Sequence, residues 1–409
     1  MRIWAFPSFY PLDHPGLKWS GIFAHRQYVG LKENGAEVKV IVPVLWYPPK
    51  PFSKLNSNWK MLSRVNYPKE RTFEGVQVYH PRIANMKPSR LFNRKQYEER
   101  YTQAIVSFFK SNNIQLNKET DIFYSQWIPT GRMVQQAARQ LGVKSAMLAI
   151  GDDIVVWPHE SADKKAAFIK AWKEADLRLA VAAYLADEGN KIVGEVLPYK
   201  VVRRGVEHQK FVPAKPGEKE RIRQEFNLPA DKIIILTVGS ALVRKGWLDL
   251  FDALAEIVKT NQDILLVGIH SGSKELQLDD EAAKRGLTKY FLNMGEVAPQ
   301  TINQLYVAAD IFCLPSHWEG IANSVVEAMS CGLPVLTTAV CGHPELITSG
   351  ENGILVEPKQ PGQITKELAM LISDRKKRET LGANARNFIV DVWGSFAQNS
   401  AKLYKILSS

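Results

Sequence analysis

The sequence predicts an α/β protein made of two doubly wound parallel domains. Runs of β-branched and apolar residues of strand length alternate with helical patterns along both halves, which is typical of parallel sheets covered by helices. The chain has 409 residues, 45% of them hydrophobic, enough for two to three domains with sizeable cores. The alternation is interrupted near residues 203–213 by a stretch rich in proline and charge. We therefore expect the domain boundary there.

Each expected strand is a short apolar run bounded by turn residues. In the first half we expect strands at residues 2–7, 37–43, 122–124, 145–150, 177–181 and 196–202. In the second half we expect them at residues 233–238, 264–267, 291–294, 311–314, 334–338 and 353–356. Open α/β sheets bind ligands at the carboxyl ends of their strands, so two such domains facing each other across a cleft would hold a ligand between them.

Cysteine content and hydropathy exclude several protein classes. The three cysteines, Cys313, Cys331 and Cys341, lack close Cys or His spacing, which argues against a disulfide framework and against a zinc site. We find no apolar stretch of the roughly 18 residues that a membrane-spanning helix needs. The opening MRIWAFPSFYP has no small-residue cleavage site and is expected to form the first strand rather than a signal peptide. A cytoplasmic protein is the expectation.

The net charge of +11 lies entirely in the first half. Residues 1–200 hold 29 Lys and Arg against 18 Asp and Glu, whereas residues 201–409 hold 24 of each. The segment KPSRLFNRKQYEERYTQAIVSFFK, residues 87–110, interleaves bases with aromatic residues. Such a segment suits an anionic membrane surface or an anionic acceptor, or else it is a solvated helix whose bases extend over apolar neighbours. No nucleic-acid-binding motif accompanies the charge, so we expect no nucleic-acid partner.

A pair of carboxylates marks the second half. The stretch HWEGIANSVVEAMSCGLPVL, residues 317–336, places Glu319 before an expected helix and Glu327 inside it. Asn323 or Ser324 is expected to cap that helix. Free amides and the positive end of the helix dipole favour phosphate, and acceptors on either side suit hydroxyl groups, which is the layout of a nucleotide sugar. The alternative is a loop charge beside a solvated helix residue.

A second motif supplies cations. In ILTVGSALVRKGWLDLFDAL, residues 235–254, Arg244 and Lys245 occupy a loop between a strand and an amphipathic helix. A guanidinium and an ammonium there would face anionic phosphates in different ways. Neither a Gly-x-Gly-x-x-Gly nor a Walker pattern is present, so a tightly wrapped dinucleotide or NTP site is disfavoured. Taken alone, a Lys-Gly pair after a strand is also typical of an ordinary turn.

Together these motifs resemble retaining glycosyltransferases of the GT-B fold, the large family 4. The resemblance runs from about Val201 to the C-terminus, and its Glu-x7-Glu element is highly specific. The matching segments are VRKG at 243–246, the stretch at 293–338, GHPELITSGENGILVEP at 342–358 and VWGSF at 392–396. The first half resembles the acceptor domain of that family more loosely. The resemblance implies two Rossmann-like doubly wound domains that face each other across a cleft.

The resemblance also implies roles for individual residues. Glu327 would accept ribose hydroxyls and Glu319 hydroxyls of the donor sugar, while Val297 would line the base pocket. Fixed cations and helix amides would stabilise the leaving diphosphate without a metal. The implied catalytic residues are Glu319, Lys245, Arg244 and Asp153. The implied donor-binding residues are Gly21, Gly239, Arg244, Lys245, Val297, Glu319, Gly320, Ile321, Ala322, Asn323 and Glu327.

The chain departs from the family pattern at three positions. A single glycine, Gly21, stands where the family often has a pair, so one residue has to allow close backbone approach to the diphosphate. Ile150 stands where many members have a histidine, which removes an imidazole from the transferred sugar. Ser240 stands where many members have an arginine, which leaves the phosphate charge to the cations of the VRKG loop.

Two further polar features have less definite roles. Asp152 and Asp153 are adjacent carboxylates that would orient the acceptor or raise each other's pKa, with Asp153 the stronger candidate. His317 has a neighbouring Trp318 and no second histidine at ligand spacing, so we expect a structural histidine and no metal site.

We expect a retaining hexosyltransferase that uses a nucleotide-diphosphate sugar, with UDP or GDP, and requires no cofactor. Its acceptor would be a glycan or a lipid-linked molecule, and the basic first half would hold the protein on the inner face of a membrane. The expected domains are 1–202 for the acceptor, 203–385 for the donor, and a helix within 386–409 that crosses back onto the first. A nucleotide-sugar epimerase of similar layout and a non-catalytic glycosyltransferase-like subunit are the alternatives.

Overall fold

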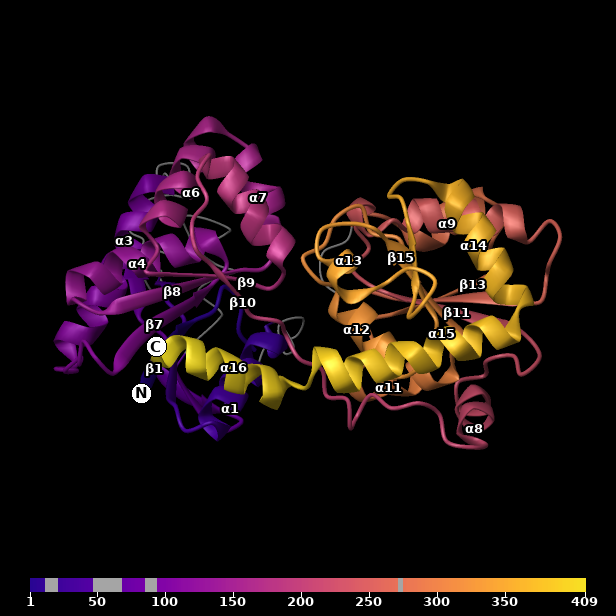
Figure 1. Cartoon of the computed structure of the whole chain (residues 1–409), viewed down its shortest axis with the longest axis horizontal. Helices are drawn as coiled ribbons and strands as arrows, with labels where there is room; N and C mark the ends of the chain where they lie inside the picture. The colour runs from indigo at the N-terminus through magenta and orange to yellow at the C-terminus, as the bar shows by residue number, and fades with distance from the viewer. Residues whose placement is uncertain (12–20, 47–67, 85–93, 271–274) are drawn as a thin grey trace, which may run out of the picture. The chain divides into compact units, whose positions relative to one another are not determined.

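The computed structural model describes residues 1–11, 21–46, 68–84, 94–270 and 275–409, which divide into two compact units (Figure 1). Unit 1 contains residues 1–204 and 396–409, and unit 2 contains residues 205–395. Both are built on largely parallel sheets with helices on both faces, so the predicted α/β fold class is confirmed. The assignment of acceptor to the first half and donor to the second stays a prediction.

The sheet of unit 1 has eight strands, parallel except at one edge. Its strand order reverses at β1, which pairs with β2 on one side and β7 on the other. The order across the sheet is β10 (Lys200–Val201), β9 (Leu177–Ala180), β8 (Lys144–Ala149), β7 (Asp121–Gln126), β1 (Arg2–Phe6), β2 (Glu37–Ile41), β5 (Val76–Tyr79) and β4 (Glu70–Phe73). A separate parallel pair joins β3 (Val44–Trp46) to β6 (Arg82–Ala84).

Helices cover both faces of that sheet. In Figure 1, α3 (Arg94–Ser111) and α4 (Ile128–Leu141) lie on one face, and α1 (Ile22–Glu33) and α16 (Phe396–Ser408) lie on the other. The connection from β8 to β9 contains α5 (Asp152–Val155), the 3-10 helix η3 (Trp157–His159) and α6 (Ala162–Glu174), and the connection from β9 to β10 contains α7 (Ala183–Val193). None of the helices in the described ranges combines the length and apolarity needed to cross a bilayer.

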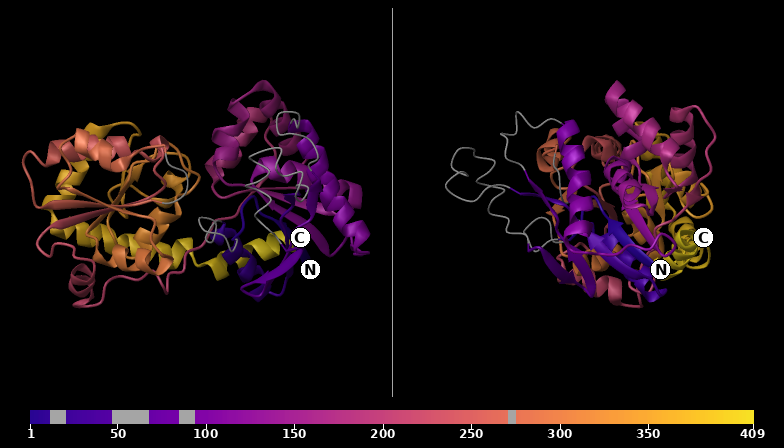
Figure 2. Two further views of the ribbon diagram at one scale, coloured as in Figure 1. Left: turned by 180° about the vertical axis from the view of Figure 1, so that it is seen from behind. Right: turned by 90° about the vertical axis from the view of Figure 1, so that its left-hand side faces the viewer.

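The last helix of the chain packs on the first. The Ser400 hydroxyl on α16 donates to the Gln27 carbonyl of α1 at 3.2 Å, and the rings of Phe23 and Phe396 stack 6.5 Å apart. Gly30 allows this approach, because a Cβ on it would lie 2.5 Å from the Ser400 oxygen. The indigo and yellow helices therefore run side by side in both figures of the whole chain (Figures 1 and 2). The chain enters α16 through a π-helical turn, η5 (Ile389–Trp393), rather than by one continuous helix from residue 386.

The sheet of unit 2 has six parallel strands with the order β13 (Phe291–Gly295), β12 (Ile264–Ile269), β11 (Ile233–Val238), β14 (Ile311–Leu314), β15 (Val335–Thr338) and β16 (Ile354–Val356). Its helices are α8 (Glu218–Glu225), α9 (Trp247–Ile257), α10 (Leu278–Lys284), α11 (Pro299–Ala308), α12 (Asn323–Ser330), α13 (His343–Leu346), α14 (Pro361–Ser373) and α15 (Arg375–Phe388), with the 3-10 turn η4 (Val243–Lys245) before α9. The strand order reverses between β11 and β14, which makes that edge the switch point of the sheet.

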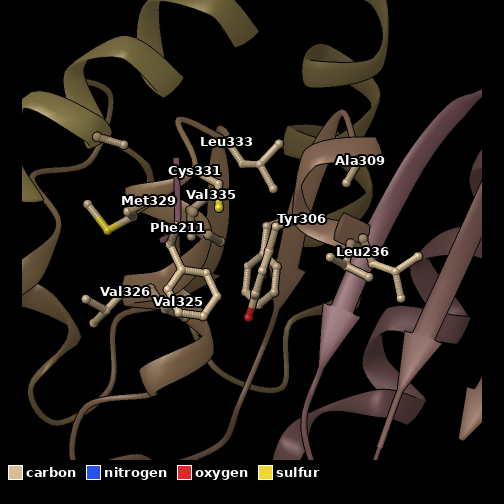
Figure 3. Packing of buried hydrophobic residues seen from close by; sticks show 14 of the residues in the cluster. Phe211, Leu236, Tyr306, Ala309, Val325, Val326, Met329, Cys331, Leu333 and Val335 are labelled. Carbon is tan, nitrogen blue, oxygen red and sulfur yellow. The ribbon is translucent and has the colours of Figure 1, made fainter. Parts of the chain in front are cut away.

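Two apolar cores lie on the two faces of this sheet. One is built around Trp247 and Phe251 of α9, and the other around Tyr306 of α11 and Met329 of α12. Figure 3 shows the second core, where Phe211 and Tyr306 lie edge to face with ring centroids 5.8 Å apart. This core fixes α11 against α12 and so positions the residues that precede and begin α12.

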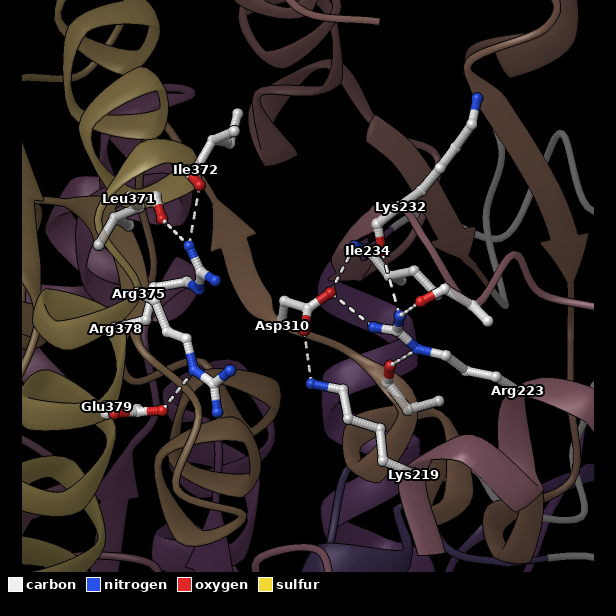
Figure 4. Close-up of polar contacts among 12 residues, drawn as sticks. Lys219, Arg223, Lys232, Ile234, Asp310, Leu371, Ile372, Arg375, Arg378 and Glu379 are labelled. Atoms are coloured by element: carbon white, nitrogen blue, oxygen red, sulfur yellow. Dashed lines mark hydrogen bonds and ion pairs between the residues drawn. The ribbon is translucent and has the colours of Figure 1, made fainter. Parts of the chain in front are cut away.

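A buried ionic network ties α8 to the amino end of β11. Asp310 accepts from Arg223 Nη2 at 2.5 Å, from Lys219 Nζ at 2.5 Å and from the Ile234 amide at 2.7 Å (Figure 4). The Arg223 side chain is 7% exposed. Burial works to raise the pKa of Asp310, but the Lys219 and Arg223 charges and the amide lower it. The network lies at the amino ends of the strands, opposite the edge where ligands bind in such sheets.

The strand predictions were accurate in the parallel cores and wrong at the edges of unit 1. The expected strand at 196–202 is only β10, Lys200–Val201, and Val196 is 93% exposed. The antiparallel hairpin of β4 and β5 was not predicted. Its turn is Glu74-Gly75, with φ of 43° and 76°, a left-handed pair for which Asn-Gly is the familiar sequence and Glu-Gly is not.

Candidate functional site

The candidate site of unit 2 lies at the carboxyl ends of β11 and β14, where the strand order reverses. The loop after β11 contains Gly239 and leads through η4 into α9, and the loop after β14 contains Glu319 and leads into α12. Because β11 and β14 are parallel neighbours, both loops emerge at the same edge of the sheet. Two sequence motifs that are about 75 residues apart are therefore brought together.

Close backbone packing locks the two loops together. The His317 amide donates to the Arg244 carbonyl at 2.7 Å. Gly246, with φ of 73°, touches the second loop so closely that a Cβ would lie 1.9 Å from the Pro315 carbonyl oxygen. Glycine is thus required at this position by both its backbone conformation and its contact. The Lys-Gly pair of the VRKG motif therefore packs the two loops together through Gly246 and supplies positive charge through Lys245.

Lys245, Arg244 and Glu319 form the charged centre of this site. Lys245 Nζ donates directly to Glu319 Oε1, and Arg244 Nη1 lies 3.8 Å from the same oxygen. The side chains of Lys245 and Glu319 are 13% and 11% exposed. Burial works to raise the pKa of Glu319, but the Lys245 charge and hydrogen bond, with Arg244, bring it below the ordinary value. Glu319 is therefore an anion at neutral pH, with two cations beside it.

Neighbouring side chains hold this centre in place. The Ser316 hydroxyl donates to Glu319 Oε1 at 3.3 Å, and the Arg244 guanidinium lies 6.0 Å from the centre of the Trp318 ring. His317 Nε2 lies 2.6 Å from Asp249 Oδ2 on α9. This contact ties the loop after β14 to the helix that follows the loop after β11. These contacts give His317 the structural role that its sequence context suggests.

The start of α12 presents its backbone rather than a capping side chain. Ala322 is the N-cap residue and no side chain caps the helix, so the predicted capping by Asn323 or Ser324 is wrong. The Val325 and Val326 amides donate to the Ala322 carbonyl, whereas within the described ranges the amides of Asn323 and Ser324 have no acceptor. Amides at this position suit an anionic ligand.

The turn before α12, which is predicted to bind phosphate, is held by the loop after β15. The Gly320 carbonyl accepts from the Gly342 amide at 3.1 Å, which ties the turn to the loop after β15. Ala322 is buried, and Ile321 packs on the apolar core shown in Figure 3. The apolar side chains of the predicted phosphate-binding turn therefore anchor it, and its backbone amides are the groups left for a ligand.

Glu327 is held by a tyrosine from the neighbouring helix. The fully buried Tyr306 hydroxyl lies 3.0 Å from Glu327 Oε2 and 3.2 Å from the Ser324 carbonyl oxygen. Burial, together with the Glu327 charge, raises the pKa of Tyr306 well above its ordinary value, so the phenol stays protonated and can donate. Glu327 has one oxygen oriented by Tyr306 and remains partly exposed.

The two remaining predicted donor-binding residues of unit 2 flank this edge. Gly239 directly follows β11, and its amide donates to the Ile269 carbonyl at 3.0 Å. A Cβ on Gly239 would lie 3.6 Å from the Lys245 side chain, so the glycine adjoins the charged centre. Val297 follows β13 and packs in part on the core around Tyr306.

The predicted residues of unit 1 follow the carboxyl ends of β1 and β8 in its own sheet. Gly21 precedes α1 with φ of 74°, and a Cβ there would lie 2.1 Å from the Phe9 carbonyl oxygen. Asp153 is fully buried and accepts from the amides of Ile128, Ile150 and Gly151 at 2.8–3.0 Å. Burial raises the pKa of Asp153 to about 6, although these amides lower it. Such bonds favour a structural role for Asp153, which shapes the loop after β8.

The basic segment of unit 1 uses its aromatic residues internally. The described part is α3, where Tyr101 and Phe109 are buried in the core between α3, α4 and the sheet, and Tyr97 and Phe108 pack on that core. Tyr101 and Phe109 thus cover the sheet, whereas Tyr97 and Phe108 stay partly exposed. Residues 85–93, which carry Lys87, Arg90, Leu91 and Phe92, lie outside the described ranges.

Two residues of this edge were not anticipated from the sequence. Tyr306 has the helical spacing of a core residue, and nothing in the pattern indicates that its hydroxyl reaches Glu327. His343 is fully buried at the start of α13. Burial lowers the pKa of its imidazole, while the Glu319 charge raises that pKa and the Lys245 charge lowers it. Within the described ranges, no cluster of three or more His, Cys, Asp or Glu side chains is arranged to bind a metal ion.

Comparisons with known proteins relate this chain to glycosyltransferases. Residues 218–388 match the family model for glycosyl transferases group 1. The chain is 27% identical over 365 residues to TuaC of Bacillus subtilis (strain 168), a protein assigned to teichuronic acid biosynthesis as a glycosyltransferase; the match covers 88% of this chain and 86% of TuaC. Several other curated relatives match over only about half of their own length.

Solved structures show the same architecture. A sucrose-phosphate synthase from Thermosynechococcus elongatus superposes with a TM-score of 0.78 at 17% identity, covering 100% of this chain and 99% of that one. Anabaena Alr3699/HepE in complex with UDP-glucose superposes with a TM-score of 0.71 at 18% identity, covering 100% and 99%. The chain therefore has the GT-B fold, and through residues 218–388 it is similar to the glycosyl transferases of group 1.

Proposed function

We propose that this protein is a retaining glycosyltransferase of family 4 that moves a hexose from a nucleotide-diphosphate sugar to a glycan or lipid-linked acceptor without a metal. The observation that carries the proposal is the convergence of Lys245, Arg244 and Glu319 on one edge of unit 2, beside the uncapped start of α12. Cations and free amides suit a diphosphate, and carboxylates suit the hydroxyl groups of the rings attached to it.

Each side chain has a defined part in the proposal. Arg244 and Lys245 stabilise the negative charge that the diphosphate gathers as it leaves, and the amides of Asn323 and Ser324 bind its distal phosphate. Glu319 accepts hydroxyls of the transferred sugar, and Glu327 accepts hydroxyls of the ribose. Lys245 donates to Glu319, so in this proposal a donor that engages both groups separates the pair, with the diphosphate taking the cation and the sugar taking the carboxylate.

The proposed reaction is a front-face displacement. The bond from the anomeric carbon to the phosphate oxygen breaks, the acceptor oxygen bonds to the same face of that carbon, and the departing phosphate oxygen takes the acceptor proton. This step needs fixed positive charge more than it needs a nucleophilic carboxylate. The bond from the His317 amide to the Arg244 carbonyl supports it, because it fixes the backbone of the loop that carries both cations.

The nucleotide is identified by a thermal-shift panel of UDP-, GDP- and ADP-sugars. A donor at 100 times its dissociation constant adds about 2.7 kcal/mol of stability. UDP and GDP donors are expected to stabilise the protein; UDP-glucose is a first choice because Alr3699/HepE, which shares the fold, binds it. No stabilisation by any member of the panel would contradict the proposal.

Turnover assays separate the proposal from its alternatives. Incubation with donor alone gives little product if an acceptor is required, whereas an epimerase converts the sugar without one. Ile150, in place of the histidine of many family 4 members, is the feature that favours a non-catalytic subunit. Donor binding with no transfer to any glycan or lipid-linked acceptor would support that alternative.

The proposed location is the cytoplasmic face of a membrane, with the basic first half of the chain toward anionic lipid. The net charge of +11 in residues 1–200 supports this location through electrostatic attraction. Sedimentation with vesicles that contain anionic lipid, compared with neutral vesicles, is the test. Equal binding to both would contradict the electrostatic attachment.

A further inference from the structure

A cavity of about 650 Å³ lies at the β4 edge of the sheet in unit 1. It is lined by α3, by the start of β4, and by the end of β5 with the segment that follows it. This volume is typical of pockets for small ligands. The strands β7, β1 and β2 lie between β5 and β8, the strand that precedes Asp153. The cavity is therefore separate from the predicted site residues of unit 1, and the proposed reaction does not use it.

One side of α3 lines the cavity because its residues recur at helical spacing. Two adjacent rows with a spacing of four residues contribute, namely Arg100, Ala104 and Phe108, and Gln103, Ser107 and Ser111. The first row supplies a cation and an aromatic ring, and the second supplies an amide and two hydroxyls. The Ser111 hydroxyl donates to the Ser107 carbonyl at 2.6 Å, so its oxygen keeps lone pairs that can accept from a ligand hydroxyl.

The opposite wall is fixed by His80, which is 2% exposed. Its Nδ1 lies 3.1 Å from the Val42 carbonyl oxygen, and Arg71 Nε donates to its Nε2 at 3.3 Å. Its amide donates to the Lys69 carbonyl at 2.8 Å. Because both ring nitrogens are occupied within the protein, His80 orients the backbone between Lys69 and Arg82 and leaves ligand binding to those two cations.

The charges around the cavity are mostly positive. Lys69, Arg82 and Arg100 are cations, and Glu70 is the carboxylate among the described residues that line it, which leaves a net charge of +2. Burial, together with the charges of two nearby arginines, lowers the pKa of His80 to about 4, so this ring adds no charge at neutral pH. Burial also lowers the pKa of Arg82, whose guanidinium is therefore partly removed from water. Water screens such a charge less, so it attracts an anionic ligand more strongly than a fully exposed one does.

Aromatic rings and hydrogen-bonding side chains occur together in this cavity. The ring centroids of Tyr79 and Phe108, which both line it, lie 5.1 Å apart. Aromatic surface suits the C–H face of a sugar ring, whereas the Gln103 amide and the hydroxyls of α3 suit sugar hydroxyls. Guanidinium and ammonium groups suit a carboxylate or a phosphate. Attachment to a lipid surface uses exposed charge and apolar area and requires no such cavity.

We propose that this cavity, the anionic-saccharide pocket, binds a saccharide that carries a carboxylate or a phosphate. Lys69, Arg82 and Arg100 pair with the anionic group, and Tyr79 and Phe108 pack on the sugar ring. Under the proposed function this saccharide belongs to the acceptor, and in that respect the inference rests on the proposed function. It adds that the acceptor is acidic.

Isothermal titration calorimetry in the absence of any nucleotide sugar tests the pocket. The full chain is titrated with tri-galacturonate and with the neutral trisaccharide maltotriose, and separately with glucose 6-phosphate and with glucose. At least one of the two anionic saccharides is expected to bind at least about tenfold more tightly than its neutral counterpart, and more weakly as salt is added. No binding of either anionic saccharide, or equal binding of the neutral ones, would overturn the inference.

Three variants locate the binding. Lys69→Gln and Arg100→Gln each remove a charge from the pocket and should weaken binding by about tenfold, because a charge-assisted hydrogen bond is lost. Lys110→Gln removes an exposed charge from the same helix outside the pocket and should change the affinity by less than about twofold. Lys69 is exposed, so its variant is expected to fold, and thermal unfolding checks this. Unchanged affinity in the folded Lys69→Gln and Arg100→Gln proteins would overturn the inference.

The outcomes also separate this inference from the proposed function. If nucleotide sugars stabilise the protein but no anionic saccharide binds, the proposed function stands and the pocket is rejected. If an anionic saccharide binds through Lys69 and Arg100 but no nucleotide sugar does, the pocket stands and the proposed function fails. If the two variants reduce sedimentation with anionic vesicles and leave saccharide binding unchanged, these charges serve a lipid surface and the inference is rejected.

Discussion

Removing the ammonium of Lys245 should destabilise unit 2 in a pH-dependent way. In Lys245→Met the aliphatic stem remains while Glu319, only 11% exposed on its side chain, loses its direct partner. Removing one member of a fully buried pair destabilises a protein by about 3–5 kcal/mol. Arg244 at 3.8 Å and the Ser316 hydroxyl remain, so we expect the lower value of about 2–3 kcal/mol.

The sign of the pH dependence follows from the pKa of Glu319. In the wild-type protein this pKa is lowered from its ordinary value of 4.5, so Glu319 contributes stability above that pH and the contribution is lost as pH falls through the lowered pKa. In Lys245→Met, burial remains as the main influence and raises the pKa. The deficit of the variant should therefore be smallest below the lowered wild-type pKa of Glu319 and should grow toward neutral pH.

Urea unfolding of the wild-type protein and Lys245→Met at several pH values tests this reasoning. Lys245→Met combined with Glu319→Gln is the control, because removing both charges leaves no unpaired ion and should recover much of the lost stability. Turnover by the single variant should fall far more than its folded fraction, since the ammonium opposes the charge of the leaving diphosphate. A deficit relative to the wild type that is no larger at neutral pH than at acidic pH, or wild-type turnover in the variant, would refute the argument.

Three further predictions concern the donor, the metal and the fold. Glu327→Ala should weaken nucleotide binding by about 1–3 kcal/mol, because hydroxyl groups of the ribose lose their acceptor; unchanged affinity by calorimetry would remove Glu327 from the site. Transferase activity should survive EDTA, and a complete loss that Mg²⁺ or Mn²⁺ restores would contradict metal independence. Asp310→Ala should destabilise unit 2 by about 3–5 kcal/mol, because Arg223, 7% exposed, becomes a buried unpaired charge. In contrast to Lys245→Met, it should leave donor affinity of the folded protein unchanged, and reduced affinity without reduced stability would contradict the structural role.

The fold could be predicted because parallel strands buried on both faces are continuous apolar runs. Strands such as β11, Ile233–Val238, and β14, Ile311–Leu314, carry this pattern in their own composition. Edge strands such as β4, Glu70–Phe73, are polar on their exposed side and short, so their pairing depends on the turn at Glu74-Gly75 and on the neighbouring strand. Composition alone therefore does not indicate them.

The sequence by itself determined which charged and polar residues the candidate site contains. The tertiary structure decided which of those residues contact one another. Local order along the chain shows that Arg244 and Lys245 follow a strand and that Glu319 precedes a helix, since those patterns are set by nearby residues. Only the strand crossover places β11 beside β14 and so brings Lys245 onto Glu319. Tyr306 comes to contact Glu327 in the same way, because burial and hydrogen bonding depend on neighbours that are distant in the chain.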